Sequence, residues 1–346
     1  MSKSVVVGKH VGGSKLVSNP EHFNKWLRGE NPGPLVIEVG ATNGCNHNCV
    51  HCMFQQYVKY KKEKSFIDLL SFKNFLDDFK AMGGIEVYFA GNGEPLLNES
   101  LPDFIEHGSS VGLNMAMSTN GVFLTPEVSE RILPCMRFLK FSINGSDRES
   151  YKRIHRCDES DFDTVIKNIG YAVSFRNEHK LNLQIVLQFL TLRTNYKAVE
   201  GIVRICKQLD ADKVIIRNAI FKNNTMATYS DEFVQYLKSI NDDGKVDIRW
   251  DTFGITEMEE KVWTHCYGIN FRTNMDTRGN LFTCNKTLDT DSTFGNIIEE
   301  RFSAIWNSER KRAVFAEVEK GENISGCKGW CQTSFDNVYI EKNKDR

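Results

Sequence analysis

From residue 35 onward, the chain alternates short runs of β-branched or apolar residues with segments in which apolar residues recur at helical spacing. This alternation is typical of βα units, whose strands join into a parallel sheet. The strand candidates are residues 35–39, 85–90, 113–118, 138–143, 183–191 and 214–217. About six such units fit a partial barrel, whereas a closed one needs eight. We therefore expect an α/β fold built on a partial (β/α)6 barrel.

Apolar residues on one helical face predict the helices between these strands. One such face lies between the first two strands and another between the last two: Phe72, Phe75, Leu76 and Phe79, then Ile202, Ile205, Cys206 and Leu209. Thr125 followed by Pro126 is typical of the start of a capped helix. We expect a barrel over residues 35–220, preceded by an extension, 1–34, with one helical candidate at 21–27. A bridge, 221–260, with a helix near 232–240 and a strand near 246–250, leads into a small domain, 261–346.

The composition excludes several classes of protein. The 346 residues suffice for one large or two modest domains, and the net charge of -1 gives no reason to expect binding to nucleic acid or to a membrane surface. No apolar segment approaches the roughly 20 residues of a membrane span, and the first residues lack a signal-peptide core. We therefore expect a cytoplasmic protein, in which ten cysteines are typical of reduced thiols and metal ligands.

Three of these cysteines, Cys45, Cys49 and Cys52, follow the first predicted strand directly. Their C-x3-C-x2-C spacing is too tight for disulfides among themselves, but three thiolates can share one metal centre. Zinc sites and ordinary electron-transfer clusters use four protein ligands, so three cysteines leave one metal position open for chemistry. The residues alone also allow a zinc knuckle completed by His47 or His51, or a cysteine-rich loop without metal.

This cysteine loop at the end of a first strand resembles the radical S-adenosylmethionine (radical SAM) superfamily. The resemblance implies that Cys45, Cys49 and Cys52 hold a 4Fe-4S cluster, which binds S-adenosylmethionine at its open iron. It further implies one-electron cleavage of this cofactor to methionine and a 5'-deoxyadenosyl radical, which abstracts hydrogen from a substrate. A reductant such as flavodoxin or ferredoxin would supply the electron. One departure is His51, where the family usually has an aromatic residue.

The second predicted strand leads into Gly91, Asn92, Gly93 and Glu94. In isolation this is a weak turn signal, although glycines let a ligand approach the backbone and a carboxylate can accept from an ammonium. At this position the segment resembles the superfamily's glycine-glycine-glutamate motif, interrupted here by Asn92. The resemblance implies that Gly91, Gly93 and Glu94 contact the methionyl amino group of the cofactor.

Further candidates for cofactor binding follow the next two strands. Ser118 and Asn120 end the third strand, although Asn120 with the following glycine can simply form a turn. Ser142 ends the fourth strand, where the resemblance implies a position facing the ribose or carboxylate of the cofactor. His155 stands where the family usually has an arginine, so no arginine is assigned to the cofactor. Asn195 fits a helix cap as well as a ligand.

A second set of cysteines lies near the end of the chain: Cys266, Cys284, Cys327 and Cys331. Four thiolates complete one metal centre, and zinc would fit that count as well as iron. Their spacing, with a glycine between the first two, a GNI sequence and a helix with tryptophan, resembles the SPASM domain and its shortened form, Twitch. The full SPASM pattern has seven cysteines, so the resemblance implies the shortened form with one auxiliary 4Fe-4S cluster. If Cys327 or Cys331 did not ligate, that cluster would keep an open iron.

These features predict an oxidoreductase of the radical SAM type that acts on a small polar molecule. The Twitch architecture resembles enzymes acting on aminocyclitols and aminosugars, so we expect oxidation of an alcohol or amine, with a peptide substrate less favoured. One alternative is an epimerase or peptide-modifying enzyme, in which Cys157 would return hydrogen to the substrate radical. A non-enzymatic alternative is an iron-sulfur or zinc scaffold.

Overall fold

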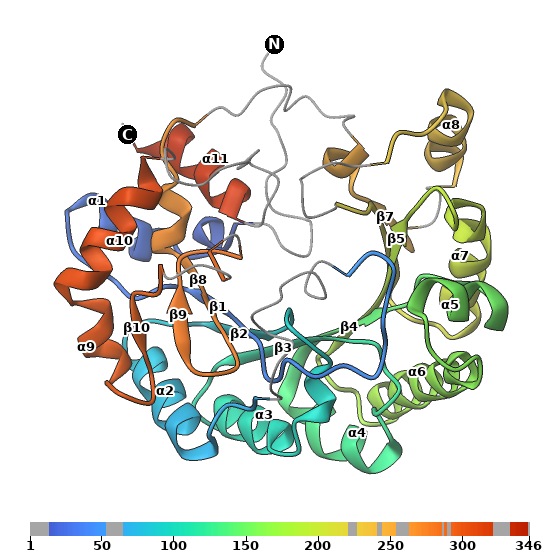
Figure 1. Cartoon of the computed structure of the whole chain (residues 1–346), viewed down its shortest axis with the longest axis horizontal. Helices are drawn as coiled ribbons and strands as arrows, with labels where there is room; N and C mark the ends of the chain where they lie inside the picture. The colour runs from blue at the N-terminus through green and yellow to red at the C-terminus, as the bar shows by residue number, and fades with distance from the viewer. Residues whose placement is uncertain are drawn as a thin grey trace.

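The computed structural model of the protein describes residues 14–52, 65–220, 227–240, 244–253, 263–285, 287–288, 292–320 and 333–344. Within these residues, one curved sheet of ten strands runs through the molecule, and most helices lie on its outer side (Figure 1). The strand order is β10-β9-β8-β1-β2-β3-β4-β5-β6-β7. Strands β1 to β7 pair in parallel with one another in chain order, which confirms the predicted barrel-type α/β fold.

The six predicted strands form within two residues of their expected bounds. They are β1 (Val36–Val39), β2 (Glu86–Phe89), β3 (Asn114–Thr119), β4 (Met136–Ser142), β5 (Gln184–Thr191) and β6 (Lys213–Asn218). A seventh parallel strand, β7 (Val246–Ile248), pairs with β6. The strand expected within the bridge, residues 221–260, is therefore part of the barrel sheet.

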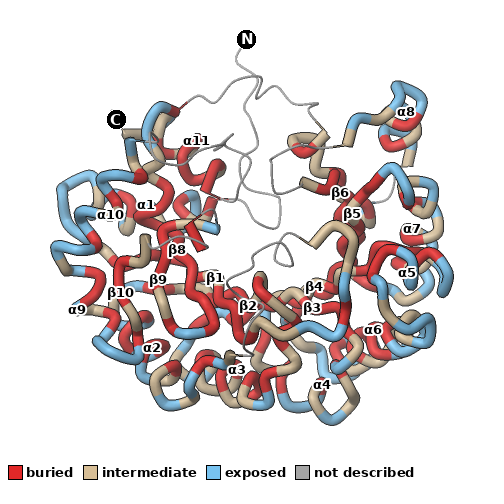
Figure 2. Tube along the Cα trace, in the orientation of Figure 1, coloured by how far each residue is buried: buried red, intermediate tan, exposed pale blue. Residues whose placement is uncertain are grey.

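Eight α-helices of the described chain precede or accompany these strands. They are α1 (Pro20–Leu27), α2 (Leu69–Ala81), α3 (Leu101–Ser110), α4 (Pro126–Ile132), α5 (Arg148–His155), α6 (Ser160–Glu178), α7 (Val199–Gln208) and α8 (Asp231–Ser239). The predicted apolar face of α2 is buried, and the side chain of Thr125 caps α4. Helices α3, α5 and α6 are not among the predicted elements. Figure 2 shows that the strands are mostly buried, whereas the outer surfaces of the helices are exposed.

Alternate residues of each strand point to opposite faces of the sheet. Ile37, Phe89, Leu139 and Phe141 belong to the hydrophobic core that the strands share with the outer helices. Residues next to such core residues along a strand therefore point to the inner face, and they include a set of polar side chains: Glu38, Tyr88, Ser118, Lys140, Ser142 and Arg217. The sheet thus has an apolar outer face, which holds the fold together, and a polar inner face, which is suited to binding.

The carboxyl-terminal region continues the same sheet. Strand β8 (Arg272–Met275) pairs in parallel with β1, and β9 (Asn280–Phe282) and β10 (Gly295–Asn296) follow in antiparallel order. A hairpin turn joins β8 to β9: the N–H of Asp276 donates to the carbonyl of Asn280 at 3.0 Å, and Gly279 has φ +80°. The described residues of this region also form three helices: α9 (Phe302–Trp306), α10 (Glu309–Glu319) and α11 (Thr333–Asn343).

Helix α9 docks on α2 of the barrel. The ring centroids of Phe302 and Phe75 are 5.1 Å apart, and the N–H of Ser303 donates to Asp78 Oδ2 at 2.6 Å. Together with the pairing of β8 with β1, these contacts join the small carboxyl-terminal domain to the barrel. None of the helices that the structure describes combines the length and the apolar character needed to cross a membrane.

Candidate cofactor and cluster site

The loop that carries Cys45, Cys49 and Cys52 leaves β1 and is held by the end of α5. The N–H of Asn48 donates to the carbonyl of His155, and the N–H of Val50 donates to the carbonyl of Ile154, both at 3.0 Å. The last carbonyls of a helix have no partner inside it, so they are available to accept these bonds. These two bonds fix the loop to α5 on either side of Cys49.

His155 also contacts the loop through its side chain. Its Nδ1 lies 3.4 Å from Cys49 Sγ, and its Nε2 lies 3.1 Å from the backbone nitrogen of Asn144. A backbone N–H can only donate, so Nε2 accepts and Nδ1 of the neutral ring carries the hydrogen. Burial holds the pKa of His155 well below its usual value, which keeps the ring neutral. His155 therefore donates an N–H···S hydrogen bond to Cys49.

Sequence reasoning missed this role of His155. The available signal is its place in the family motif, where it substitutes for an arginine, but no spacing indicates that its ring turns toward Cys49. Asn144 was also missed: besides donating to His155, it accepts from the N–H of Leu190 at 2.7 Å through Oδ1. Asn195 braces this region, since its Nδ2 donates to the carbonyl of Asn144 at 3.0 Å.

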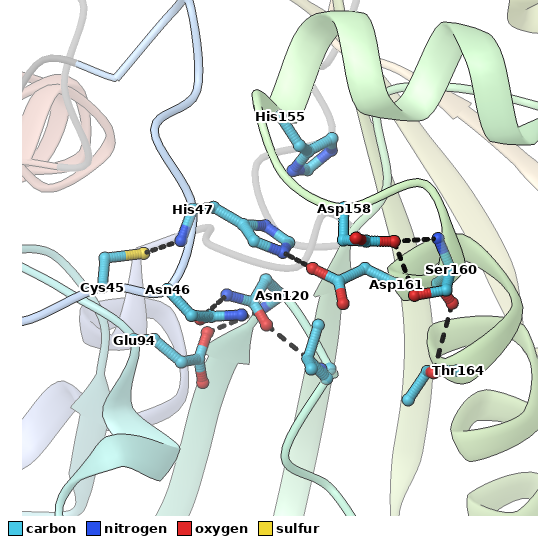
Figure 3. A network of polar contacts seen from close by, with 12 residues as sticks. Cys45, Asn46, His47, Glu94, Asn120, His155, Asp158, Ser160, Asp161 and Thr164 are labelled. Carbon is cyan, nitrogen blue, oxygen red and sulfur yellow. Dashed lines mark hydrogen bonds and ion pairs between the residues drawn. The ribbon is translucent and has the colours of Figure 1, made fainter.

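A polar contact holds the other side of the loop (Figure 3). His47 Nε2 lies 3.0 Å from Asp161 Oδ2 at the start of α6, and the N–H of His47 points to Cys45 Sγ at 3.4 Å. Cys157 joins His47 and Asp161 in a group whose potential ligand atoms lie within 4.8 Å of one another. Cys157 is half-buried and packs against the core shared with the helices. Burial first, and then the charge of Asp161, raise the pKa of its thiol to about 12.

The glycine-glutamate turn after β2 packs directly on the cysteine loop. The N–H of Glu94 donates to the carbonyl of Gly44 at 2.9 Å. A Cβ on Gly93 would lie 2.3 Å from that carbonyl oxygen and 2.5 Å from the oxygen of Thr42, so only glycine fits there. Gly91 has φ +98°, a backbone conformation that favours glycine. In the described structure, the glycines thus bring Glu94 beside the loop.

The carboxylate of Glu94 is buried and partly satisfied by the end of β3. Its Oε1 accepts from Thr119 Oγ1 at 2.6 Å and from the N–H of Leu96 at 3.2 Å, and its Oε2 accepts from the N–H of Asn120 at 2.7 Å. A carboxylate has about four acceptor positions, so Oε2 can accept from one further donor. Burial raises the pKa of Glu94 to about 7, against the effect of these hydrogen bonds. A cationic donor would favour its ionised form.

The remaining predicted residues lie at the neighbouring strand ends. Asn120 connects Glu94 to the cysteine loop, because its Nδ2 donates to Asn46 Oδ1 at 2.8 Å (Figure 3). Ser118 shares a hydrogen bond of 2.5 Å with the hydroxyl of Tyr88 on the inner face. Ser142 lies half-buried at the end of β4, where it pairs with Gln188 of β5. The structure thus joins Glu94 and Asn120 to the loop, while Ser118 and Ser142 lie on the inner face.

The second set of cysteines is described in part. Asn337 Nδ2 of α11 donates to Cys266 Sγ at 3.3 Å, and its Oδ1 accepts from the N–H of Gly268 at 2.7 Å. Cys284 is half-buried two residues after the end of β9, and its carbonyl accepts from the N–H of Thr287 at 3.0 Å. Cys327 and Cys331 lie outside the described residues.

The residues of the loop fit an iron-sulfur cluster. Cys45, Cys49 and Cys52 form no disulfide. Burial, and then the nearby thiols of Cys45 and Cys52, raise the pKa of Cys49, so the three sulfurs are close enough to oppose one another's ionisation. A metal cation removes that opposition, because a coordinating thiol is deprotonated by the metal. The N–H of His155 points to sulfur, and the open acceptor of Glu94 fits an ammonium group.

Comparison with known proteins agrees with this site. The radical SAM superfamily matches residues 39–189, which contain the three cysteines and the glycine-glutamate turn. An iron-sulfur cluster-binding domain, SPASM, matches residues 266–332, which contain all four cysteines of the second set.

Three curated relatives show a more distant likeness. An AdoMet-dependent heme synthase of Methanosarcina barkeri is 31% identical over 34% of this chain and 33% of its own length. A heme synthase of Nitratidesulfovibrio vulgaris is 23% identical over 90% of this chain and 88% of its own. A PqqA peptide cyclase of Bradyrhizobium diazoefficiens is 26% identical over 54% of this chain and 46% of its own. The chain thus spans less than half the length of the first and third of these relatives.

Among solved structures, SuiB of Streptococcus suis bound to S-adenosylmethionine is similar with a TM-score of 0.67 and 14% identity. The match covers 95% of this chain and 80% of SuiB. SuiB has also been solved with its precursor peptide SuiA. This likeness confirms the fold, and the matches of the two domains confirm the predicted cofactors, S-adenosylmethionine and 4Fe-4S clusters. The chain is therefore an enzyme of the radical SAM superfamily with a carboxyl-terminal SPASM domain.

Proposed function

We propose that the protein is a radical SAM enzyme that modifies a peptide. The observation that carries this proposal is the likeness of nearly the whole chain to SuiB, which binds a precursor peptide, together with the likeness to PqqA peptide cyclases. The named relatives do not support the aminocyclitol substrate expected from the sequence. They favour the peptide-modifying alternative.

The three cysteines of the β1 loop would hold the cluster, and Glu94 would accept a hydrogen bond from the methionyl ammonium through Oε2. When bound, the cluster and S-adenosylmethionine supply the 5'-deoxyadenosyl radical that takes a hydrogen atom from the substrate. Asn120 would hold Glu94 in a fixed position relative to the loop, since it contacts both Glu94 and Asn46. Ser142, at the inner end of β4, would face the rest of the cofactor.

The carboxyl-terminal cysteines would hold the auxiliary cluster in the shortened, one-cluster form. Cys266, Cys284, Cys327 and Cys331 are the four cysteines within the matched SPASM region. Asn337 would orient Cys266 through its 3.3 Å contact with Sγ. An electron released when the substrate radical is oxidised could pass to this cluster, and flavodoxin or ferredoxin would reduce the first one.

An activity assay tests whether a peptide is the substrate. Reconstituted enzyme with dithionite and S-adenosylmethionine is incubated with the low-molecular-mass fraction of an extract of the native cells. We expect this fraction to stimulate 5'-deoxyadenosine formation, and we expect prior protease treatment of the fraction to remove the stimulation. Stimulation that survives the protease would overturn the peptide proposal in favour of a small molecule, such as the expected aminocyclitol or a porphyrin.

Cys49→Ala serves as the control, because it removes a proposed ligand of the first cluster. This variant should form no 5'-deoxyadenosine with any fraction. If it remained active, the cofactor cleavage would not depend on the β1 loop, and the proposed site would be wrong.

A further inference from the structure

The inner face of the sheet carries two cations on strands that end at the cluster site. Lys140 of β4 lies two residues before Ser142, and Arg217 of β6 lies at the penultimate position of its strand. Their strand neighbours Leu139, Phe141 and Ile216 belong to the core on the outer side, so both cations point inward. Lys140 pairs in register with Ser118. At about 3.3 Å per residue, Lys140 lies roughly 7 Å deeper than the end of β4.

The other cations near this face have acidic partners. Arg249 pairs with Asp251 at 3.0 Å, and Arg272 pairs with Asp336 at 3.7 Å. At the amino-terminal end of β2, Lys15 pairs with Glu86 at 2.7 Å. These charges are therefore balanced by the protein itself.

Lys140 and Arg217 differ from them. In the described part of the chain, neither side chain forms an ion pair, and the ammonium of Lys140 lies 5.5 Å from the ring centroid of Tyr88. The Nε of Arg217 is buried without a hydrogen-bond partner. Burial first, and then the charge of Arg217, lower the pKa of Lys140 to about 7, against the opposite effect of Glu38. Unpaired like charges in a partly buried place are costly, and an anion bound between them would remove the cost.

We propose that Lys140 and Arg217 bind a carboxylate of the substrate, the side chain of an aspartate or glutamate in the peptide that the enzyme modifies. Arg217 supplies the planar donor set that suits a carboxylate, and Lys140 supplies a second charge. Glu38, on the inner face of β1, adds a negative group to the same layer as Tyr88. A doubly charged phosphate would meet more repulsion from Glu38 than a singly charged carboxylate does.

This inference rests on the proposed peptide substrate and adds its chemical class. Through β5, Lys140 lies two residues below the level of Ser142 and Arg217 lies two residues beyond it, so the carboxylate would bind between them at about the depth of Ser142. The neighbouring part of the peptide would then lie beside the strand ends, where the radical forms. An acidic residue would thus fix which position of the peptide is presented for hydrogen abstraction.

A peptide selection tests the inference. Random decapeptides displayed on their own mRNA are selected on the reconstituted holoenzyme with S-adenosylmethionine, using the wild type, Lys140→Gln/Arg217→Gln, and Lys167→Gln/Lys238→Gln. The last variant removes two exposed lysines of the outer helices α6 and α8, so it matches the loss of charge. We expect peptides with an acidic residue at a fixed position to be enriched on the wild type and on this control. A selected peptide should bind the inner-face variant at least about tenfold more weakly.

Each other outcome has a distinct meaning. Enrichment of neutral peptides, or equal binding of the acidic ones to the inner-face variant, would overturn the inference and leave the peptide substrate standing. The absence of any enriched sequence would overturn the peptide substrate and the inference together. The single variants Lys140→Gln and Arg217→Gln, with iron content and thermal unfolding as measures of folding, provide the comparison if the double variant does not fold.

Discussion

His155 donates an N–H···S hydrogen bond to Cys49, with Nδ1 3.4 Å from Sγ, and accepts from the N–H of Asn144 through Nε2. Hydrogen bonds to the sulfurs raise the reduction potential of an iron-sulfur cluster, because they stabilise the more negative, reduced form. With Cys49 as a ligand of the first cluster, as proposed, the geometry would link a residue of α5 to the readiness of that cluster to accept an electron.

Two substitutions separate the bonds of His155. Gln reaches the position of Nε2, so His155→Gln keeps a partner for Asn144 and loses the donor to Cys49. Asn reaches the position of Nδ1, so His155→Asn does the reverse. We expect His155→Gln to lower the midpoint potential of the cluster by tens of millivolts, up to roughly 60 mV, which is a tenfold change in a one-electron equilibrium. His155→Asn should stay near the wild-type potential in the same electron paramagnetic resonance titration.

The control for these variants is His107→Gln on α3. His107 also pairs through its ring, with Asp77 at 2.7 Å, but it lies on the exposed outer surface. The midpoint potential of the first cluster in His107→Gln should match that of the wild type. Equal potentials for His155→Gln and the wild type would show that His155 only packs against the loop.

Gly93→Ala should disturb the cluster loop. The added Cβ would lie 2.3 Å from the oxygen of Gly44 and 2.5 Å from that of Thr42, and backbone atoms have little freedom to retreat. We expect the iron content after reconstitution to fall by at least half and the free energy of unfolding to fall by about 2 kcal/mol.

Gly170→Ala is the matched control in α6, because a Cβ there would meet only Leu209 Cδ2 at an ordinary 3.7 Å. Alanine in a helix interior is favoured over glycine by about 0.5–1 kcal/mol, so this variant should keep its iron and gain stability. A Gly93→Ala protein with full iron content would contradict the packing that we describe between the glycine-glutamate turn and the loop.

Cys157→Ala should keep both 5'-deoxyadenosine and product formation. The thiol lies beside His47 and Asp161 and packs against the core on the helix side, not among the inner-face residues. A hydrogen donor must reach the substrate radical, and a thiol on the helix side of the sheet is poorly placed to do so. The measurement is the ratio of product to 5'-deoxyadenosine by mass spectrometry. A variant that still forms 5'-deoxyadenosine but loses its product would identify Cys157 as the donor of an epimerase.

The sequence predicts those features that depend on short, local patterns. Strand alternation and the helical spacing of Phe72, Phe75 and Phe79 predict the barrel, and the cysteine spacing predicts the cluster loop. The contacts of His155 depend on how the end of α5 turns, and residue spacing does not indicate this. The sequence also does not indicate that β8, within the expected small domain, pairs with β1, because this pairing joins residues more than 200 positions apart.

Lys140→Met should stabilise the apoprotein while weakening its binding to acidic peptides. The groups that act on Lys140 are Glu38, Arg217 and Arg249, and burial together with the two arginines lowers its pKa from 10.5 to about 7. A pKa lowered in the folded state means that the unfolded chain binds more protons between these values, so wild-type stability rises with pH across that window.

Methionine removes this dependence. Because the cost of the unpaired charge is greatest below pH 7, we expect a gain of about 1–2 kcal/mol at pH 6 that disappears near pH 10. Thermal unfolding at the two pH values measures it, with Lys167→Met on the surface as the control. Destabilisation by Lys140→Met at pH 6 would mean that the ammonium has a favourable partner within the protein, and the carboxylate site would lose its main support.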